Sequence, residues 1–364
     1  MKILLVTDAW APQVNGVVRT LENTRHMLES FGHQVDVLSP QGQATLPCPG
    51  YREIRLTLRP FQAVRRQLAQ GPFDAIHIAT EGPLGLAARR WCRRHGLAFT
   101  TSCHTRFPEY IRLRLPIPVA WSYAWLRWFH AAAERTMVRS PGQKKDLAAR
   151  GFQHLSVWPG AVDTTLFYPR ERDALKLPRP IALYAGRVAV EKNLEAFLGL
   201  SLPGSKVVVG DGPDLQNLKR RYPDVHFTGY LNGDSLAATI ASADVFVFPS
   251  LTDTLGLVNL EAMACGVPVA AFPAPGVSDL VCDGGNGAID DDLGQAVFRA
   301  LAVDGSACVE FASQFTWEAC TRRFEDLLCV PADAAGSLES PTTDGMVAES
   351  LLKNSKPATT ALQN

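Results

Sequence analysis

The sequence predicts an α/β protein built from two Rossmann-like, doubly wound domains whose parallel sheets face each other across a cleft. Short apolar runs alternate with helical stretches in both halves of the chain, and a Pro-rich segment without periodicity separates the halves. A length of 364 residues suits two domains. We expect an N-terminal domain over residues 1–165 and a C-terminal domain over residues 175–312.

In the N-terminal half, the apolar run at residues 3–7 predicts a buried strand. A loop with Pro12, Asn15 and Gly16 follows and leads into a helix that ends near Phe31. Similar apolar runs predict further strands at residues 35–38, 75–78, 98–102, 136–138 and 156–158. Helical stretches between them predict helices at residues 61–70, 84–95, 119–135 and 141–150.

Residues 158–180 are rich in proline and turn-forming residues and predict the connection between the domains. Beyond it, strands are predicted at residues 181–185, 206–210, 225–228, 245–249 and 267–271. Helices are predicted at residues 194–200, 214–222, 235–242, 257–265 and 293–303. A closing helix within residues 313–329 is expected to return toward the N-terminal domain. Residues 331–364 contain few large apolar side chains and predict a disordered tail.

The composition indicates a globular chain, with 46% hydrophobic and 20% charged residues. The eight cysteines are scattered without a C-x-x-C spacing, so we expect neither a metal site nor a disulfide framework, and a cytoplasmic location. Prolines 116 and 118, Arg127 and His130 interrupt the most apolar stretch, which therefore does not predict a membrane span.

The two halves differ in charge, although the whole chain has 36 basic and 36 acidic residues. Residues 1–160 contain 21 Lys and Arg against 10 Asp and Glu, and the remainder contains 15 against 26. An anionic partner is therefore expected to meet the N-terminal half. The basic residues form no recognisable nucleic-acid-binding module, so nucleic acid is not an expected partner.

The first candidate ligand loop is AGRVAVEKN, residues 185–193, which follows a predicted strand and leads into a helix. Gly186 permits close backbone approach, and Arg187 and Lys192 add two cations beside a helix N-terminus. This combination suits a diphosphate. The alternative is a turn flanked by two solvated surface cations.

The second candidate loop begins at Pro249 and also follows a strand. Thr254, Leu255 and Gly256 are expected to present backbone N–H groups to an anion at the start of a helix. Asp253 lies at the helix entrance, where it could serve as the N-cap, and Glu261 lies two turns further along. Both carboxylates are able to face the cleft, one near each end of an extended ligand.

Three weaker signals follow other strands. Gly210, in the segment VVVGDGP, permits a tight turn near a ligand. Gly16 could bring backbone against a phosphate from the opposite side of the cleft. His104, in the segment CHTRFPEY, follows a predicted strand and could reach the cleft, although an isolated histidine is more often structural.

Together these segments resemble glycosyltransferase family 4, retaining nucleotide-sugar-dependent enzymes of the GT-B fold. The most specific parts are GRVAVEKN, VVVGDGP and ADVFVFPSLTDTLGLVNLEAMACGVPVAA, and VTDAWAPQVNGVVRTL is also similar. The resemblance covers about residues 1–328 and is closest to bacterial mannosyltransferases and glycolipid-forming transferases. It implies a nucleotide-sugar donor, a lipid or glycan acceptor and GDP-mannose as the preferred donor.

The resemblance also implies roles for individual residues. Arg187 and Lys192 would bind the donor diphosphate, Glu261 the ribose hydroxyls, and His104 the donor sugar near the reacting centre. Gly16 would lie under the phosphate and sugar. The backbone of Leu255, Gly256 and Leu257 would offer further contacts.

Two positions depart from the family pattern. Asp253 replaces the first glutamate of the usual pair, which keeps the charge on a shorter arm and leaves the sugar identity open. Asn15 precedes Gly16 where a Gly-Gly pair is common. We expect leaving-group stabilisation by Arg187 and Lys192, and therefore neither a metal nor a cofactor. No carboxylate pair across the sugar is identified, so attack from the face that the diphosphate leaves is the preferred hypothesis.

The acceptor side is expected at residues 112–130, where Trp121, Trp125 and Trp128 share one helical face. The basic residues near them are Arg112, Arg114 and Arg127. This helix could rest on an anionic membrane and deliver a lipid acceptor at the inner face of the cytoplasmic membrane. Equally, the three tryptophans could pack inside the domain.

Two other functions remain open. One is a UDP-hexose-dependent transferase that acts on a soluble or polysaccharide acceptor. The other is a non-catalytic protein that binds a sugar nucleotide. A dinucleotide-dependent oxidoreductase is not favoured, because no G-x-G-x-x-G opens the first helix.

Overall fold

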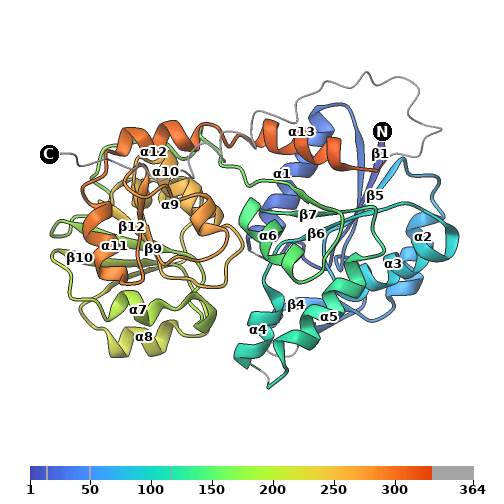
Figure 1. Ribbon diagram of the computed structural model, residues 1–364, viewed down its shortest axis with the longest axis horizontal. Coiled ribbons are helices and arrows are strands. Elements are labelled where there is room, and N and C mark those ends of the chain that lie inside the picture. Colours follow the sequence, from blue (N-terminus) through green and yellow to red (C-terminus); the bar gives the residue numbers. More distant parts are fainter. Residues whose placement is uncertain (14, 49–50, 115, 330–364) are drawn as a thin grey trace, which may run out of the picture.

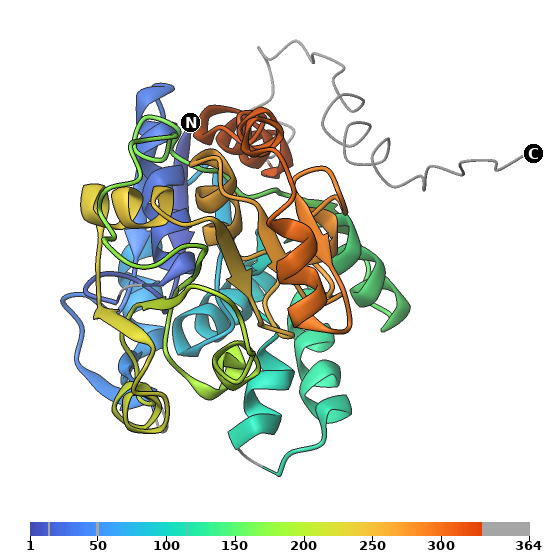
Figure 2. The same cartoon turned by 90° about the vertical axis from the view of Figure 1, so that its left-hand side faces the viewer.

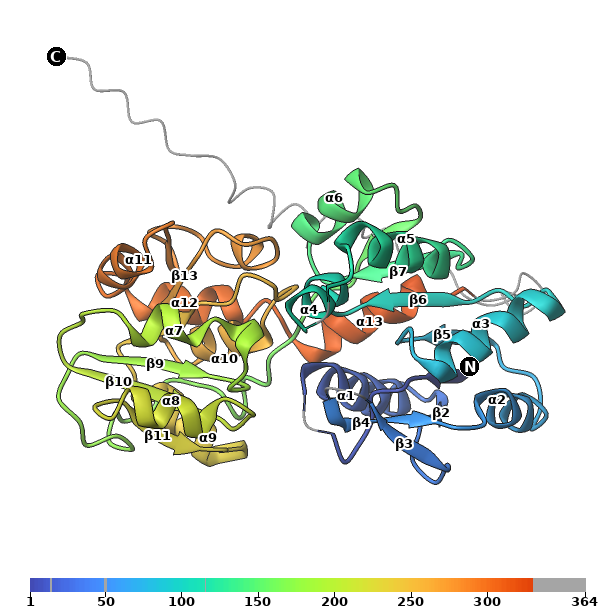
Figure 3. The same cartoon turned by 90° about the horizontal axis from the view of Figure 1, so that it is seen from below.

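Two six-stranded sheets of parallel strands form two domains that lie side by side (Figures 1 and 3). The computed structural model describes residues 1–13, 15–48, 51–114 and 116–329. The predicted α/β class with two Rossmann-like domains is confirmed. The predicted disordered tail lies outside the described residues, as does the side chain of Arg114.

The N-terminal sheet has the strand order β2-β1-β5-β6-β7-β8. Its strands are β1 (Lys2–Val6), β2 (Gln34–Leu38), β5 (Ala75–Ile78), β6 (Thr100–Cys103), β7 (Arg135–Val138) and β8 (Leu155–Val157). Alternate side chains of β1 face opposite sides: Ile3 and Leu5 pack toward α1 (Gly16–Ser30), whereas Leu4 and Val6 pack toward α2 (Pro60–Leu68) and α3 (Pro83–His95).

The remaining N-terminal helices lie on the α3 side of the sheet. They are α4 (Phe107–Arg114), α5 (Val119–His130) and α6 (Pro141–Ala149). Helices α4 and α5 project from one side of the domain in two perpendicular views (Figures 1 and 2). A separate antiparallel hairpin consists of β3 (Thr45–Cys48) and β4 (Tyr51–Thr57).

The C-terminal sheet has the strand order β11-β10-β9-β12-β13-β14. Its strands are β9 (Ile181–Ala185), β10 (Ser205–Val209), β11 (His226–Gly229), β12 (Val245–Phe248), β13 (Val269–Ala271) and β14 (Gly287–Ile289). Its helices are η1 (Val190–Lys192), α7 (Leu194–Leu198), α8 (Leu215–Arg221), α9 (Gly233–Ala241), α10 (Leu257–Ala264), η2 (Val277–Asp279), α11 (Leu293–Ala300) and α12 (Gly305–Ala312).

The last described helix, α13 (Trp317–Leu327), crosses back to the N-terminal domain and packs beside α1 (Figure 1). Its Phe324 is fully buried, with its ring centroid 4.9 Å from that of His77 and 4.8 Å from that of Trp158. The C-terminal end of the described chain therefore completes the core of the N-terminal domain.

Several short elements escaped prediction. The hairpin strands β3 and β4, the strand β14 and the helices α4 and α12 are each eight residues long or shorter, so their periodicity is weak. The helix predicted over residues 119–135 instead ends at His130. Glu134 already donates its backbone N–H to Phe99 O at 3.0 Å, because the chain is turning into β7. Among the described residues, every helix falls short of the length and apolar content that crossing a membrane requires.

We predict that Phe324→Ala destabilises the protein by about 3–5 kcal/mol, because it leaves a cavity between His77 and Trp158. Urea unfolding followed by circular dichroism measures the loss. Phe298→Ala, at a half-exposed position of α11, is the matched control and should change stability by about 0.5 kcal/mol or less. Equal effects of the two substitutions would show that α13 does not complete the core.

Candidate active site at the junction of the two domains

Each sheet contains a point at which the strand order reverses. In the N-terminal sheet it lies between β1 and β5, and in the C-terminal sheet between β9 and β12. Ligands of open α/β sheets bind at such points, beyond the carboxyl ends of the strands. The loops after β9 (residues 186–193) and β12 (residues 249–256) carry Arg187, Lys192 and Asp253 to the second of these points.

Side-chain hydrogen bonds connect these two loops. Asn193 Nδ2 donates to Pro249 O at 3.1 Å, and Thr252 Oγ1 donates to Glu191 O at 3.2 Å. Residue Asn193 adopts φ 54°, a left-handed conformation that asparagine tolerates. The two loops therefore form one surface at the end of the sheet.

Lys192 and Asp253 form an ion pair at the centre of this surface. Lys192 Nζ lies 2.6 Å and 2.8 Å from the two carboxylate oxygens of Asp253, and the two side chains are 19% and 15% exposed. Burial lowers the pKa of Lys192, but Asp253, Tyr110 and Tyr184 raise it, and the net shift is upward. Lys192 is therefore a permanent cation, and Asp253 balances its charge rather than capping a helix.

Glycines allow the neighbouring loops to approach closely. Gly186 has φ +152°, and a Cβ on Gly210 would lie 1.9 Å from Gly186 O. Tyr184 Oη donates to Arg187 O at 2.9 Å, which fixes the backbone directly after Gly186. The Arg187 side chain is partly exposed, with Nε 4.0 Å from the buried carboxylate of Glu191. Arg187 and Lys192 thus lie on the same loop beside the same strand end.

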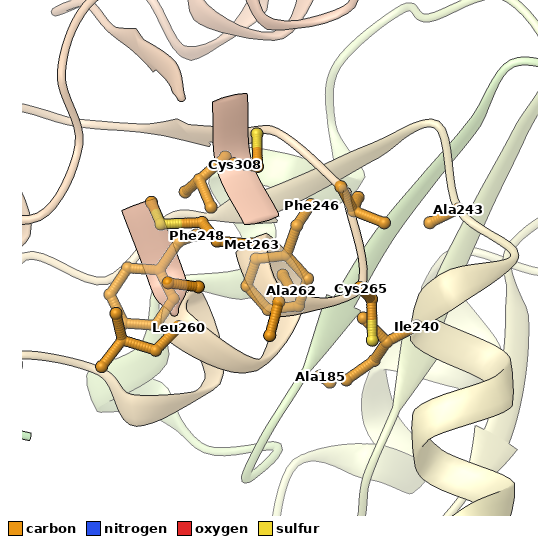
Figure 4. Close-up of a cluster of buried hydrophobic side chains, with 14 of the residues drawn as sticks. Ala185, Ile240, Ala243, Phe246, Phe248, Leu260, Ala262, Met263, Cys265 and Cys308 are labelled. Atoms are coloured by element: carbon orange, nitrogen blue, oxygen red, sulfur yellow. The ribbon is translucent and has the colours of Figure 1, made fainter. Parts of the chain in front are cut away.

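The helix α10 is anchored by an apolar face. Leu260 and Met263 lie in the cluster that contains Phe246 and Phe248 of β12 (Figure 4). Gly256 begins the helix with φ +72°, and a Cβ there would lie 2.6 Å from the Phe248 ring. This packing fixes the rotation of α10.

Glu261 of α10 is bound by Arg19 of α1, across the junction between the domains. The carboxylate is 6% exposed and the arginine side chain 40% exposed, and the guanidinium also lies over the Phe167 ring, 5.5 Å from its centroid. Burial raises the pKa of Glu261, and Arg19 opposes that shift. Glu261, which is predicted to bind the ribose, is therefore paired with a cation of the other domain in this structure.

His104 lies at the same junction on the N-terminal side. Its Nε2 is 2.8 Å from Ser102 Oγ, which is itself 3.1 Å from His77 Nε2. Burial lowers the pKa of His104 well below its ordinary value, and the nearby Arg139 adds to this effect. The backbone oxygen of His104 accepts a 2.7 Å hydrogen bond from Thr254 Oγ1. The backbone of His104 therefore contacts the C-terminal domain, whereas its neutral ring bonds Ser102 and packs against Trp158 of its own domain.

The other predicted donor-site residues lie around this contact. A Cβ on Gly16 would be 4.0 Å from Leu257 Cδ1, so the start of α1 meets the start of α10. Leu255 is buried. A cavity of about 10 Å³ at the junction, lined by Thr105, Arg106 and Thr254 among others, has room for about one water molecule. The domains are therefore closed on each other.

Two residues of the junction were not predicted from the sequence. Arg19 lies one helical turn after Gly16, so helical spacing places it on the same face. Tyr110 lies within the quoted segment CHTRFPEY, and its Oη is 3.3 Å from Asp253 Oδ1. Asn15, by contrast, caps α1 by accepting from the backbone N–H groups of Val17 and Val18.

The tryptophans of α5 lie on the surface. Trp121, Trp125 and Trp128 are 73%, 37% and 51% exposed, because the opposite face of the helix buries Tyr123, Leu126 and Phe129. Arg112 is exposed, and Arg127 Nη1 donates to Arg150 O at 2.8 Å. The alternative in which the tryptophans pack inside the domain is wrong.

A group of potential metal ligands within the described residues is Glu81, Cys103 and His130, whose ligand atoms lie within 4.8 Å of one another. Burial raises the pKa of the Cys103 thiol, which favours the protonated form that does not bind metals. Glu81 and Thr101 already hydrogen-bond the two nitrogens of His130, at 3.2 Å and 2.9 Å. These residues therefore fit a buried hydrogen-bond network better than a metal site.

Two family models match the chain, one for each domain. Glycosyltransferase Family 4 matches residues 14–166, and Glycosyl transferases group 1 matches residues 179–302. Sulfoquinovosyl transferase SQD2 of Arabidopsis thaliana is 31% identical over 86% of this chain and 70% of its own length. A GDP-mannose-dependent alpha-mannosyltransferase of Mycolicibacterium smegmatis is 33% identical over 77% of this chain and 82% of its own length.

Solved structures share the arrangement of the two domains. Sucrose-phosphate synthase from Thermosynechococcus elongatus superposes with a TM-score of 0.73 at 22% identity, over 90% of this chain and 98% of that one. Anabaena Alr3699/HepE, solved with UDP and glucose, superposes with a TM-score of 0.68 at 16% identity, over 90% and 98%. These similarities establish the GT-B fold.

We predict that Arg19→Met destabilises the protein by about 2 kcal/mol near pH 8, because it leaves the buried Glu261 carboxylate without its cation. Without Arg19 the pKa of Glu261 rises further, so the loss is largest above that pKa and shrinks as the pH falls and the carboxyl becomes protonated. Urea unfolding at about pH 5 and about pH 8 measures the difference.

Glu261→Gln is the matched second substitution. In the Arg19→Met background it should recover most of the stability lost near pH 8, because the amide needs no cation. A double variant as unstable as Arg19→Met at both pH values would mean that the ion pair does not carry the effect.

Proposed function

The chain belongs to glycosyltransferase family 4 and is a hexosyltransferase with the GT-B fold, and from this premise we propose its donor, acceptor and mechanism. The proposed reaction moves a hexose, preferably mannose from GDP-mannose, to an acceptor hydroxyl on a lipid or glycolipid, with retention of the anomeric configuration. The main observation that supports the proposal is the permanent cation Lys192, which lies beside Arg187 at the point between β9 and β12 where the strand order reverses.

The donor diphosphate would replace Asp253 as the ion-pair partner of Lys192. Breaking the bond between the anomeric carbon and the β-phosphate oxygen places negative charge on the diphosphate. Lys192 and Arg187 stabilise that charge better in the transition state than in the ground state, without a metal ion. Asp253, released from Lys192, is then free to accept hydrogen bonds from sugar hydroxyls.

The acceptor oxygen attacks the anomeric carbon from the face that the diphosphate leaves. One C–O bond forms as the other breaks, and the proton of the acceptor hydroxyl moves to the leaving phosphate oxygen. His104 is held neutral by burial, so it serves as a hydrogen-bond partner of the donor sugar rather than as an acid. Its contact with Thr254 couples this position to closure of the domains.

Glu261 would bind the ribose hydroxyls of the donor. Its carboxylate already points to the junction, but Arg19 occupies it. When the nucleotide sugar binds, the two ribose hydroxyls would either replace Arg19 as partners of the Glu261 carboxylate or bind the carboxylate lone pairs that Arg19 does not use. The relatives named as GDP-mannose-dependent mannosyltransferases support mannose, whereas the sulfoquinovosyl relative supports a different sugar.

The exposed face of α5 supports a lipid acceptor. Trp121, Trp125 and Trp128 present large amphipathic rings to the outside, and Arg127 of the same helix is exposed beside them. Aromatic and basic side chains on one helix face suit the interface of an anionic membrane. Relatives named as alpha-monoglucosyldiacylglycerol synthases are consistent with that acceptor class.

We predict that Lys192→Ala lowers turnover of the matched donor by about 100-fold or more, because it removes a cation from the leaving group. Release of nucleoside diphosphate in the presence of EDTA measures turnover. Lys219→Ala, on the surface helix α8, is the control and should keep wild-type turnover. Near-normal turnover of a folded Lys192→Ala protein would reject the role in the diphosphate site.

We predict that the wild-type protein is stabilised against heat by its nucleotide-sugar donor. Thermal melting with a panel of nucleotide sugars should give the largest rise in Tm with GDP-mannose. A larger rise with a UDP-hexose would replace the proposed donor. Binding of a nucleotide sugar without release of nucleoside diphosphate would favour a non-catalytic binding protein.

We predict that replacing Trp121, Trp125 and Trp128 by serine lowers binding to phosphatidylglycerol vesicles at low salt by roughly tenfold or more. Co-sedimentation measures the bound fraction. Tyr230→Ser, at an exposed aromatic position of the C-terminal domain, should bind like the wild type. If the wild-type protein does not sediment with these vesicles, the membrane contact is disproved.

A further inference from the structure

Arg139 follows β7, at the edge of the N-terminal sheet that meets the C-terminal domain. The neighbouring strand β6 leads to His104, and β8, on the other side, leads to Trp158. The Trp158 ring contacts both residues: its centroid is 5.6 Å from that of His104 and 4.7 Å from the guanidinium carbon of Arg139. Three adjacent strands therefore place a cation, an indole and an imidazole together beside the proposed reacting centre.

The guanidinium of Arg139 is buried without a counter-ion. The residue is 4% exposed, and within the described part of the chain neither Nη1 nor Nη2 has a hydrogen-bond partner. Among these residues no carboxylate pairs with it: burial lowers the pKa of Arg139, and the group that opposes this shift is the Cys320 thiol. Its neighbour His104 is neutral. A guanidinium remains protonated in proteins, so this is an uncompensated positive charge.

Arg89 shows how the same fold satisfies a buried arginine. It is 5% exposed, yet its Nε donates to Phe129 O at 2.8 Å and its Nη2 to Trp128 O at 2.7 Å. It also lies over an indole ring, as Arg139 does. The two arginines differ in hydrogen bonding and not in burial, so burial alone does not account for the unsatisfied Nη groups of Arg139.

We propose that Arg139 binds an anionic group of a substrate, a carboxylate, sulfonate or phosphate, in a subsite beside His104. The planar fork of a guanidinium matches two oxygens of such a group, and the indole face provides an apolar wall. The subsite rests on the proposed function, because it lies beside the position given to the donor sugar. The anionic group belongs either to the transferred sugar or to the acceptor.

Access to the subsite requires the domains to separate. The loop after β12 covers this edge: Thr254 bonds the backbone oxygen of His104, and a Cβ on Gly160 would lie 2.4 Å from Leu255 Cδ2. Substrate would enter in an open arrangement, and closure would then enclose the anion away from water, where the ion pair is strongest.

The first test compares stability and needs no substrate. Arg139→Met should leave Tm unchanged or raise it, because it removes a buried charge that has no partner. Arg89→Met is the matched control and should lower Tm, because it leaves two carbonyl groups without their donor. If Arg139→Met lowers Tm as much as Arg89→Met does, Arg139 is a structural cation and the proposal is overturned.

The second test measures anion binding directly. Inorganic phosphate, added at constant ionic strength, should raise the Tm of the wild type and of Lys192→Ala, and the rise should be smaller in Arg139→Met. An equal rise in Arg139→Met and the wild type would place phosphate elsewhere and would overturn the proposal. This arm reports on Arg139 even if no nucleotide sugar stabilises the protein, which is the result that would defeat the proposed function.

The third test identifies the source of the anion. Donors are compared as GDP-mannuronate against GDP-mannose, and acceptors as phosphatidylinositol against diacylglycerol, each carried in phosphatidylcholine vesicles. Arg139→Met should lose about 10- to 100-fold in kcat/KM on the charged member of one pair and little on the neutral member. The affected pair identifies the sugar or the acceptor as the carrier of the anion. Equal loss on charged and neutral members would overturn the proposal.

Discussion

The junction between the domains depends on two carboxylates, Glu261 buried and Asp253 partly buried, that are each matched by a cation. Lys192 neutralises Asp253 within the C-terminal domain, and Arg19 reaches from α1 to neutralise Glu261. The Arg19–Glu261 pair connects the two domains, whereas the Lys192–Asp253 pair connects two loops at the end of the C-terminal sheet. Each pair also holds in place a group that the proposed donor needs, a cation for the diphosphate and a carboxylate for the ribose. In the proposed donor-bound state, the diphosphate would take the place of Asp253 beside Lys192, and the ribose would take the place of Arg19 beside Glu261.

Helix α4 links this junction to the exposed tryptophans. Tyr110 on α4 contacts Asp253, and Glu109 on the same helix accepts a 2.7 Å hydrogen bond from Tyr123 of α5. Tyr123 lies on the buried face of the helix whose outer face carries Trp121, Trp125 and Trp128. A membrane-bound α5 would therefore hold the acceptor side in a fixed relation to the sugar site through two hydrogen bonds.

Much of this arrangement could be predicted from the sequence, because the informative loops follow strands. Apolar runs locate β9 and β12, and the residues after them, Arg187, Lys192 and Asp253, necessarily meet at one sheet edge. The partner of Glu261 could not be predicted, because Arg19 lies 242 residues away and only domain closure brings it near. The lack of hydrogen-bond acceptors around the Arg139 guanidinium could not be predicted either, because it depends on how distant segments pack and not on the neighbouring residues in the sequence.

A crystal structure with the nucleoside diphosphate bound would show whether the donor displaces the Lys192–Asp253 and Arg19–Glu261 ion pairs. We predict that Lys192 Nζ leaves Asp253 for a diphosphate oxygen, with Arg187 on the same group and Glu261 on the ribose hydroxyls. A nucleotide that binds while Lys192 remains on Asp253 and Glu261 makes no contact with the ribose would contradict it.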